Sequence, residues 1–265
     1  MYKRQAERRR DARAAEWGRR IISFSRLVAD TSELELEGSW STCGAPICEV
    51  STSSRGTIED AGPHTLQVDF ANSTLGGGVL RNGCVQEEIR FLLCPELIVS
   101  RLLAEPLADN EAFVMRGFER FSLYTGYASS FAFAGPYEEG PSEGARKREP
   151  EDQLHTSLVA IDATPYGRSM SARLDQYRHA DIERELNKAY VGYGPLETAA
   201  HRGESATLSL SAPGGRFGLA TLPAGAADGS ASPLPVCTGN WGCGAFGGCL
   251  QLKACLLYTS PSPRD

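Results

Sequence analysis

The chain has 265 residues, a formal net charge of −6, 41% hydrophobic and 23% charged residues, which is the composition of an ordinary globular protein. This length accommodates one large α/β domain or two small ones, and the composition excludes collagen, a sustained coiled coil and wholesale disorder. No run approaches the roughly 18 apolar residues of a membrane span, and the arginine-rich start lacks the apolar region of a secretory signal, so membrane and secreted classes are disfavoured.

Charge is distributed unevenly along the chain. The first 30 residues carry nine Lys and Arg against four Asp and Glu, so the rest of the chain is strongly acidic. Such a body binds polyanions poorly, and any phosphate it holds must be bound locally by backbone N–H groups. The basic arm from Arg4 to Arg20 is better explained as a solvated helix than as a nucleic-acid contact, so we expect no direct nucleic-acid binding.

Predicted strands and helices alternate along the chain. Four segments have alternating or continuous apolar residues typical of strands: 21–25, 66–70, 112–115 and 157–161. Three have apolar residues at helical spacing: 86–94, 95–104 and 181–191. Strands that alternate with helices favour an α/β fold, with a mixed or parallel sheet covered on both faces.

Other segments break this alternation. Residues 138–153 are charged and rich in Pro and Gly, which predicts an exposed loop. Residues 192–235 are rich in Gly, Ala, Ser and Pro, and at that length we expect a disordered insertion. The two ends, 1–5 and 257–265, resemble translated adapter sequence, so we expect no core there.

The eight cysteines form no recognisable metal or disulfide pattern. No two have C-x-x-C spacing, and the four histidines are scattered. The last four cysteines recur at every sixth residue, a spacing that matches no zinc site. We therefore expect reduced, mostly structural thiols in an intracellular protein, with no metal and no cofactor.

The densest constellation of glycines and acids follows the predicted strand at 66–70. The consecutive glycines 76–78 allow the backbone to approach a ligand closely. Seven residues later Gln86, Glu87 and Glu88 open a helix, and because adjacent helical side chains point about 100° apart, the two carboxylates need not face the same atom. A carboxylate beside such a turn can act as general acid and base if burial raises its pKa, although paired glutamates at a helix start more commonly compensate the helix dipole.

A second glycine-rich turn spans 242–248. A loop of this kind that leads into a helix offers N–H groups to a diphosphate, which suits an acidic protein. Taken alone, it would more often be a flexible loop than a phosphate site.

With these motifs the sequence resembles the catalytic domain of the poly(ADP-ribose) glycohydrolase family, whose signature is a triple glycine, a short spacer and Gln-Glu-Glu. The resemblance runs from about Trp17 to Gly248, except in the two loops, and includes 56–60, 66–72, 89–103, 124–127, 159–163, 184–190 and 238–248. It implies a macrodomain-like three-layer α/β/α sandwich with a mixed sheet.

The resemblance also implies where the chain departs from the family. Family members continue past the second glycine turn with a helix, a buried strand carrying an aromatic residue that stacks on adenine, and a final helix. We therefore expect a basic or foreign N-terminus at 1–17, a macrodomain at 18–248 that is incomplete at its C-terminus, and a non-native tail at 249–265. A chain of this kind is expected to be marginally stable and poorly soluble, and it could itself be inactive.

The activity implied by the resemblance is hydrolysis of the ribose–ribose O-glycosidic bonds of poly(ADP-ribose), which releases ADP-ribose through an oxocarbenium-like state. Glu88 matches the glutamate that protonates the departing oxygen and then activates water. Glu87 matches the neighbour that positions the ribose hydroxyls, and Asp69 matches an aspartate just behind them.

The implied substrate contacts surround the ADP-ribose unit. Asn72 matches an asparagine on the ribose, and Tyr127 matches a tyrosine that closes over the ligand. The expected surroundings of the adenine, the diphosphate and the distal ribose complete the set: Ile58, Glu59, Phe70, Gly76, Gly77, Gly78, Gln86, Asn240, Gly242, Gly244, Ala245 and Phe246.

The expected partners are poly(ADP-ribose) and poly-ADP-ribosylated proteins, met by a monomer in the nucleus or cytoplasm during the DNA damage response. A macrodomain that binds ADP-ribose without cleaving it is the alternative. The intact pair Glu87 and Glu88 argues against this alternative, because a binding module has no need of paired acids beside the glycines.

Overall fold

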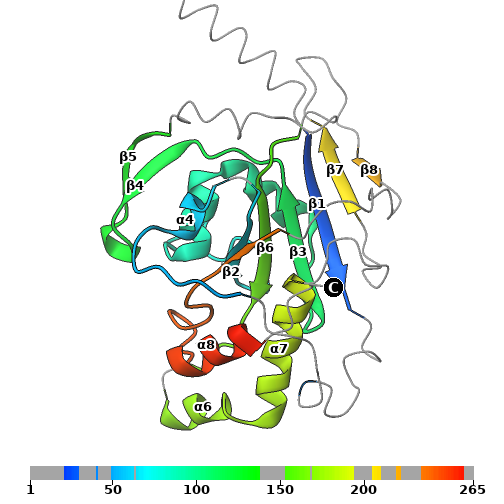
Figure 1. The fold of residues 1–265 in the computed structure, drawn as a ribbon. Coiled ribbons are helices and arrows are strands. Elements are labelled where there is room, and N and C mark those ends of the chain that lie inside the picture. The colour runs from blue at the N-terminus through cyan, green and yellow to red at the C-terminus, as the bar shows by residue number, and fades with distance from the viewer. Residues whose placement is uncertain are drawn as a thin grey trace, which may run out of the picture.

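A mixed seven-stranded sheet with helices on both faces forms the body of the chain (Figure 1). The computed structural model describes residues 21–29, 40, 49–62, 64–137, 153–167, 169–193, 205–209, 219–221 and 234–259. Within those residues, no helix combines the length and the hydrophobicity needed to cross a membrane.

The strands of this sheet lie in the order β8-β7-β1-β3-β6-β2-β9. Their bounds are β1 Ile21–Val28, β2 Leu66–Ala71, β3 Glu111–Arg116, β6 Ser157–Asp162, β7 Ser205–Ser209, β8 Leu219–Thr221 and β9 Val236–Cys237. β2 pairs in parallel with β6 and β9, while β3 lies antiparallel to β1 and β6. Because β2 and β6 are parallel, Ala71 and Asp162 end at the same rim of the sheet, where α/β folds place ligands.

Helices cover both faces of this sheet and complete three layers. Their bounds are α4 Gln86–Leu93, η2 Pro95–Val99, α5 Ser100–Leu103, α6 Met170–Asp175, α7 His179–Tyr193 and α8 Leu250–Thr259. Leu158 and Ala160 of β6 join the buried cluster that includes α4, whereas Val159 and Ile161 join the cluster that includes α7. The alternation along one strand thus separates two apolar cores, and the predicted α/β/α sandwich is confirmed.

A two-stranded hairpin stands apart from the main sheet (Figure 1). It consists of β4 (Ser122–Thr125) and β5 (Ala132–Pro136), joined by a turn that contains the 3-10 segment η3 (Ala128–Ser130). A further 3-10 segment, η1 (Ile58–Asp60), precedes β2. The hairpin carries Tyr127 to the functional site described below.

The four predicted strands are present as β1, β2, β3 and β6, and the helices predicted at 86–94 and 181–191 are α4 and α7. The helix predicted over 95–104 is instead the 3-10 segment η2 followed by the single turn α5. Short 3-10 segments of this kind commonly serve as connectors.

The described parts of the segment 192–235 include regular structure that we did not expect. α7 continues to Tyr193, and β7 and β8 lie within the segment and extend the sheet beyond β1. The expectation of a disordered insertion was wrong for these strands, because Ser205–Ser209 alternates polar and apolar residues within low-complexity flanks that obscure the pattern. The remaining residues of the segment up to 233, the arm at 1–20 and the loop at 138–152 lie outside the described residues.

The expectation that the fold ends at Gly248 was also wrong. Helix α8 comes directly after it, and its Lys253 and Leu256 are buried, with 1% and 6% of their surfaces exposed. Leu, Gln, Lys and Ala in this segment favour a helix, and Lys253 N donates to the Cys249 carbonyl at 2.9 Å in its first turn. Helix α8 therefore contributes Lys253 and Leu256 to the core, while 260–265 lie outside the described residues.

Candidate active site

Glu87 connects the end of β2 to the turn formed by the glycines 76–78, the first glycine turn. The side chain is 3% exposed, and its carboxylate accepts hydrogen bonds from the N–H groups of Asn72 (2.9 Å) and Gly76 (2.6 Å). Burial raises the pKa of Glu87 well above its usual value, and the neighbouring Asp69 adds to this effect, against the opposing influence of the two backbone donors. Both oxygens are used by the backbone, so Glu87 fixes the start of the turn.

Glu88 connects the other end of that turn to the start of α4. The side chain is 7% exposed, and its two oxygens accept hydrogen bonds from the N–H groups of Gly78 and Val85, each at 2.9 Å. The two glutamates therefore bind different parts of the turn, as the angular separation of adjacent helical residues predicts.

Gly77, between these two attachment points, lies against both carboxylates. A Cβ on this residue would stand 2.6 Å from Glu88 Oε1 and 2.7 Å from Glu87 Oε2, and its φ of +45° disfavours any side chain. Arg101 holds the turn from outside, donating to the carbonyls of Leu75 (3.0 Å) and Gly77 (2.7 Å). The triple glycine is therefore required because the backbone packs directly on the acids.

Asp69 lies behind this arrangement and is fully buried. Among the described residues, neither of its oxygens has a hydrogen-bond partner, and the same holds for the buried Nε of Arg90. Burial raises the pKa of Asp69 to about 8; Arg90 opposes this shift and Glu88 reinforces it. Asp69 therefore carries a proton near neutral pH.

The protonated Asp69 makes stability depend on pH. Burial raises the pKa of Asp69 from 3.8 to about 8. Between these two pH values the folded chain therefore keeps a proton that the unfolded chain has already lost. Its stabilising effect is complete below pH 3.8 and is lost as the pH rises through about 8. We expect the free energy of unfolding to fall over this interval by up to about 1.4 kcal/mol per pH unit, and by clearly less in Asp69→Asn. Urea unfolding of both proteins at about pH 5 and about pH 8 measures this; equal losses would contradict it.

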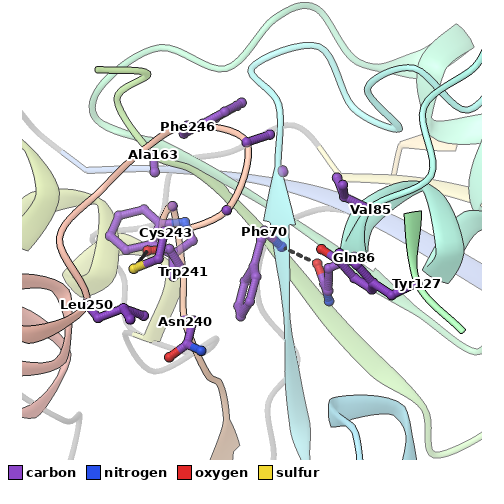
Figure 2. Close-up of a pocket in the computed structure, with 14 residues that line it drawn as sticks. Phe70, Val85, Gln86, Tyr127, Ala163, Asn240, Trp241, Cys243, Phe246 and Leu250 are labelled. Atoms are coloured by element: carbon purple, nitrogen blue, oxygen red, sulfur yellow. Dashed lines mark hydrogen bonds between the residues drawn. The ribbon is translucent and has the colours of Figure 1, made fainter. Parts of the chain in front are cut away.

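A cavity of about 410 Å³ lies between the end of β2 and the second glycine turn (Figure 2). It is lined by Phe70, Ala71, Val85, Gln86, Tyr127, Ala163, Asn240, Trp241, Gly242, Cys243, Gly244, Ala245, Phe246 and Leu250. Its size and its combination of aromatic rings with a few polar groups are typical of a site for a nucleotide-sized ligand.

Gln86 forms one side of the cavity and is held by β2. Its Oε1 accepts a hydrogen bond from Phe70 N at 2.8 Å (Figure 2), and its Nε2 donates to the Val68 carbonyl at 3.2 Å. Since Glu87 and Glu88 follow Gln86 directly, this side chain links the position of both acids to the strand that borders the cavity.

Tyr127 stands beside Gln86, on the turn of the β4–β5 hairpin (Figure 2). Its hydroxyl oxygen accepts a hydrogen bond from the Gln86 N–H, and burial of part of the ring raises the pKa of Tyr127. The side chain is still 52% exposed, so one face of the ring is available to a ligand.

The second glycine turn forms the opposite wall. It is closed by the hydrogen bond from Gly248 N to the Gly242 carbonyl at 2.9 Å, and it leads into α8. Within the described residues, no backbone hydrogen bond uses the consecutive N–H groups of Gly244, Ala245 and Phe246. Such a run of free donors at a glycine turn is suited to an anion.

The structure brings only part of the predicted site to this cavity. Eight expected contacts line it: Phe70, Gln86, Tyr127, Asn240, Gly242, Gly244, Ala245 and Phe246. The others lie outside the lining: Ile58, Glu59, Asp69, Asn72, Gly76, Gly77, Gly78, Glu87 and Glu88. Glu59 instead hydrogen-bonds the Tyr124 hydroxyl, and Asn72 Oδ1 accepts from Thr74 N at 3.1 Å.

Sequence reasoning missed several lining residues. Val85 and Cys243 lie inside motifs that had been singled out, so their places in those motifs were the available signal. Leu250 was missed because it was assigned to the tail. Across the part of the chain that the structure describes, no group of three or more His, Cys, Asp or Glu side chains could hold a metal ion.

Comparison with known proteins points to the same family as the sequence motifs. The family described as "Poly (ADP-ribose) glycohydrolase (PARG), Macro domain fold" matches residues 37–264. Poly(ADP-ribose) glycohydrolase 1 of Arabidopsis thaliana is 34% identical over 277 residues, covering 91% of this chain and 48% of the relative. Poly(ADP-ribose) glycohydrolases 1 and 2 of Caenorhabditis elegans are 36% and 37% identical, covering 74% and 71% of this chain and 21% and 33% of those relatives. The chain thus spans less than half the length of each of these proteins.

Proposed function

The chain belongs to the poly(ADP-ribose) glycohydrolase family, and from this we propose that it hydrolyses the ribose–ribose bonds of poly(ADP-ribose) and releases ADP-ribose. The observation that carries the proposal is the pair of buried glutamates held by the first glycine turn, next to a cavity of about 410 Å³. In this proposal the partners of the protein are free poly(ADP-ribose) and proteins that carry this polymer.

In the proposed mechanism Glu88 is the only proton-transferring group. It donates a proton to the ribose oxygen that leaves and then removes one from the attacking water, around an oxocarbenium-like transition state. Each Glu88 oxygen accepts one backbone hydrogen bond, which leaves a further lone pair on each for the substrate. Each Glu87 oxygen likewise accepts one backbone N–H, from Asn72 and from Gly76, and the role proposed for Glu87 is to keep the turn and the ribose in place.

The ligand is proposed to span the cavity. The free N–H groups of the second glycine turn would bind the diphosphate, which an acidic protein cannot attract through a basic surface. Phe246 and Tyr127, on different walls, offer ring faces to the sugar and base. This arrangement directs the terminal ribose towards the side of the cavity bordered by Gln86.

A binding module that holds ADP-ribose without turnover is the second candidate, and one experiment separates the two. The 265-residue protein is incubated with poly(ADP-ribose) attached to a carrier protein, released ADP-ribose is quantified by chromatography, and ADP-ribose binding is measured in parallel by calorimetry. Release supports the hydrolase. Binding without release supports the module and overturns the hydrolase.

Tyr127→Ala is expected to raise KM for the polymer about tenfold, because it removes a ring face equivalent to roughly 1.4 kcal/mol of binding. The residue is 52% exposed, so the melting temperature should change little. Phe133→Ala is the matched control, since Phe133 lies on the same hairpin, is 67% exposed and does not line the cavity. Steady-state kinetics of both variants give the answer; equal values of KM would refute a ligand contact by Tyr127.

A further inference from the structure

A buried lysine from α8 lies directly beneath the second glycine turn. Lys253 Nζ is 3.2 Å from the place where a Cβ on Gly242 would stand, and its Cε is 3.1 Å from the corresponding place on Gly248. The side chain is 1% exposed. The lysine therefore touches both ends of the turn, and the two glycines leave the space that it occupies.

Glu185 of α7 ties this ammonium group to the sheet. Lys253 Nζ and Glu185 Oε2 form an ion pair in which both side chains are 1% exposed. The other carboxylate oxygen, Oε1, accepts hydrogen bonds from Thr164 N (2.9 Å) and Thr164 Oγ1 (2.8 Å), just after β6. The end of β6, helix α7 and the glycine turn are thus joined at one point.

Two aromatic residues lie beside the ammonium group. Trp241 lines the cavity, and Tyr166 binds the second glycine turn through its backbone. Lys253 Nζ lies 4.3 Å from the ring centre of Trp241, which lines the cavity, and 6.0 Å from that of Tyr166. Tyr166 N donates to the Phe246 carbonyl within the turn at 2.9 Å. A cation is attracted to ring faces at these distances, so Lys253 also orients the residues that flank the free N–H groups.

Stability alone does not account for such a pair. Removing two charges from water offsets most of their attraction, and apolar side chains of similar volume often stabilise a core as well or better. Burial lowers the pKa of Lys253 even though Glu185 acts to raise it, so the site disfavours the charged form. An interaction with this penalty is better explained by the geometry that it imposes on the turn.

We propose that Lys253 and Glu185 are a positioning pair that holds the second glycine turn in the shape that binds an anionic diphosphate. The inference rests on the proposed function for the identity of the ligand, ADP-ribose. Neither residue contacts the ligand, because both act through the turn. Their removal weakens diphosphate binding, while the proton transfers at the first glycine turn are affected less.

The test uses the double variant Glu185→Gln/Lys253→Met in the 265-residue chain. The glutamine side chain keeps an acceptor for Thr164, and Arg184, which also pairs with Glu185 Oε1 at 3.1 Å, keeps its ion pairs with Asp162 and Asp109. We therefore expect the melting temperature to stay close to that of the parent. Calorimetry should show the Kd for ADP-ribose raised about tenfold, and that for adenosine, which lacks the diphosphate, changed less than twofold. KM for the polymer should rise about tenfold with kcat changed less than threefold.

Arg178→Met is the matched control, since it removes one partner of an exposed ion pair, Arg178–Asp175 at 2.7 Å, and should leave all these values unchanged. A double variant that binds ADP-ribose as the parent does would overturn the inference. Equal losses for adenosine and ADP-ribose would also overturn it, because they indicate general damage to the cavity. A parent that binds ADP-ribose without releasing it from polymer overturns the proposed hydrolase but leaves the binding test decisive, whereas a parent that does not bind ADP-ribose overturns both.

Discussion

Glu88→Gln is expected to lower kcat for poly(ADP-ribose) hydrolysis by about 10²- to 10⁴-fold, while the Kd for ADP-ribose changes less than threefold. The amide has nearly the shape of the carboxyl group but can neither give up nor take back a proton at neutral pH. Rates of ADP-ribose release and calorimetric binding, measured on the same preparations, check the expectation.

The surroundings of Glu88 predict a secondary effect of this substitution. Both Glu88 oxygens accept backbone N–H groups, from Gly78 and Val85, and the amide can serve only one of them. One N–H then faces an NH₂ group, which costs about 1–3 kcal/mol of stability. Glu183→Gln, on the outer side of α7, is the control for a generic loss of acid. If Glu88→Gln turned over polymer at the parent rate, the assignment of Glu88 as acid and base would be wrong.

Gly77→Ala is expected to reduce turnover at least about 100-fold and to destabilise the fold by about 1–3 kcal/mol. Its Cβ would stand 2.6 Å from Glu88 Oε1 and 2.7 Å from Glu87 Oε2, so the turn and both carboxylates must separate. The backbone donors of the two acids move with the turn. Chemical denaturation and polymer hydrolysis measure the two effects.

Gly62→Ala separates the clash from the backbone penalty. Gly62 also has a positive φ, +80°, but a Cβ there has nothing within 4 Å. It should therefore show the conformational cost of a left-handed alanine, about 1–2 kcal/mol, without loss of turnover. Equal effects of the two substitutions on turnover would mean that Gly77 does not support the acids.

The sequence predicts those parts of the fold whose local pattern agrees with their final surroundings. Buried strands such as Ser157–Asp162 are continuous apolar runs, and α4 begins at a recognisable Gln-Glu-Glu. The β4–β5 hairpin was missed because most of its side chains are exposed or half-buried, and exposed strands need no apolar alternation. Helix α8 was missed because a resemblance that ends at Gly248 carries no information about the residues beyond it.

The candidate site shows the same division between local pattern and tertiary contact. The two glycine turns and the acids are visible as motifs, since close backbone approach and charge are written in residue types. That Glu87 and Glu88 hold opposite parts of one turn depends on where β2 ends relative to α4. Among the described residues Asp69 has no hydrogen-bond partner, and Lys253 is buried beneath the second glycine turn. Both facts depend on segments that are distant in the sequence, so no local spacing reveals them.

The hydrogen bonds of Gln86 have a consequence for the outer margin of β2. Strand β9 pairs with β2 only at Leu66 and Gln67, so the later backbone groups of β2 have no neighbouring strand on that side in the described residues. The side-chain amide of Gln86 makes the hydrogen bonds to Val68 and Phe70 that a neighbouring strand would make, and the Glu87 carboxylate accepts one from Asn72 N. An uncovered margin of this kind is a template for edge-to-edge association between molecules. Gln86 and Glu87 of the candidate site thus also protect the sheet against aggregation.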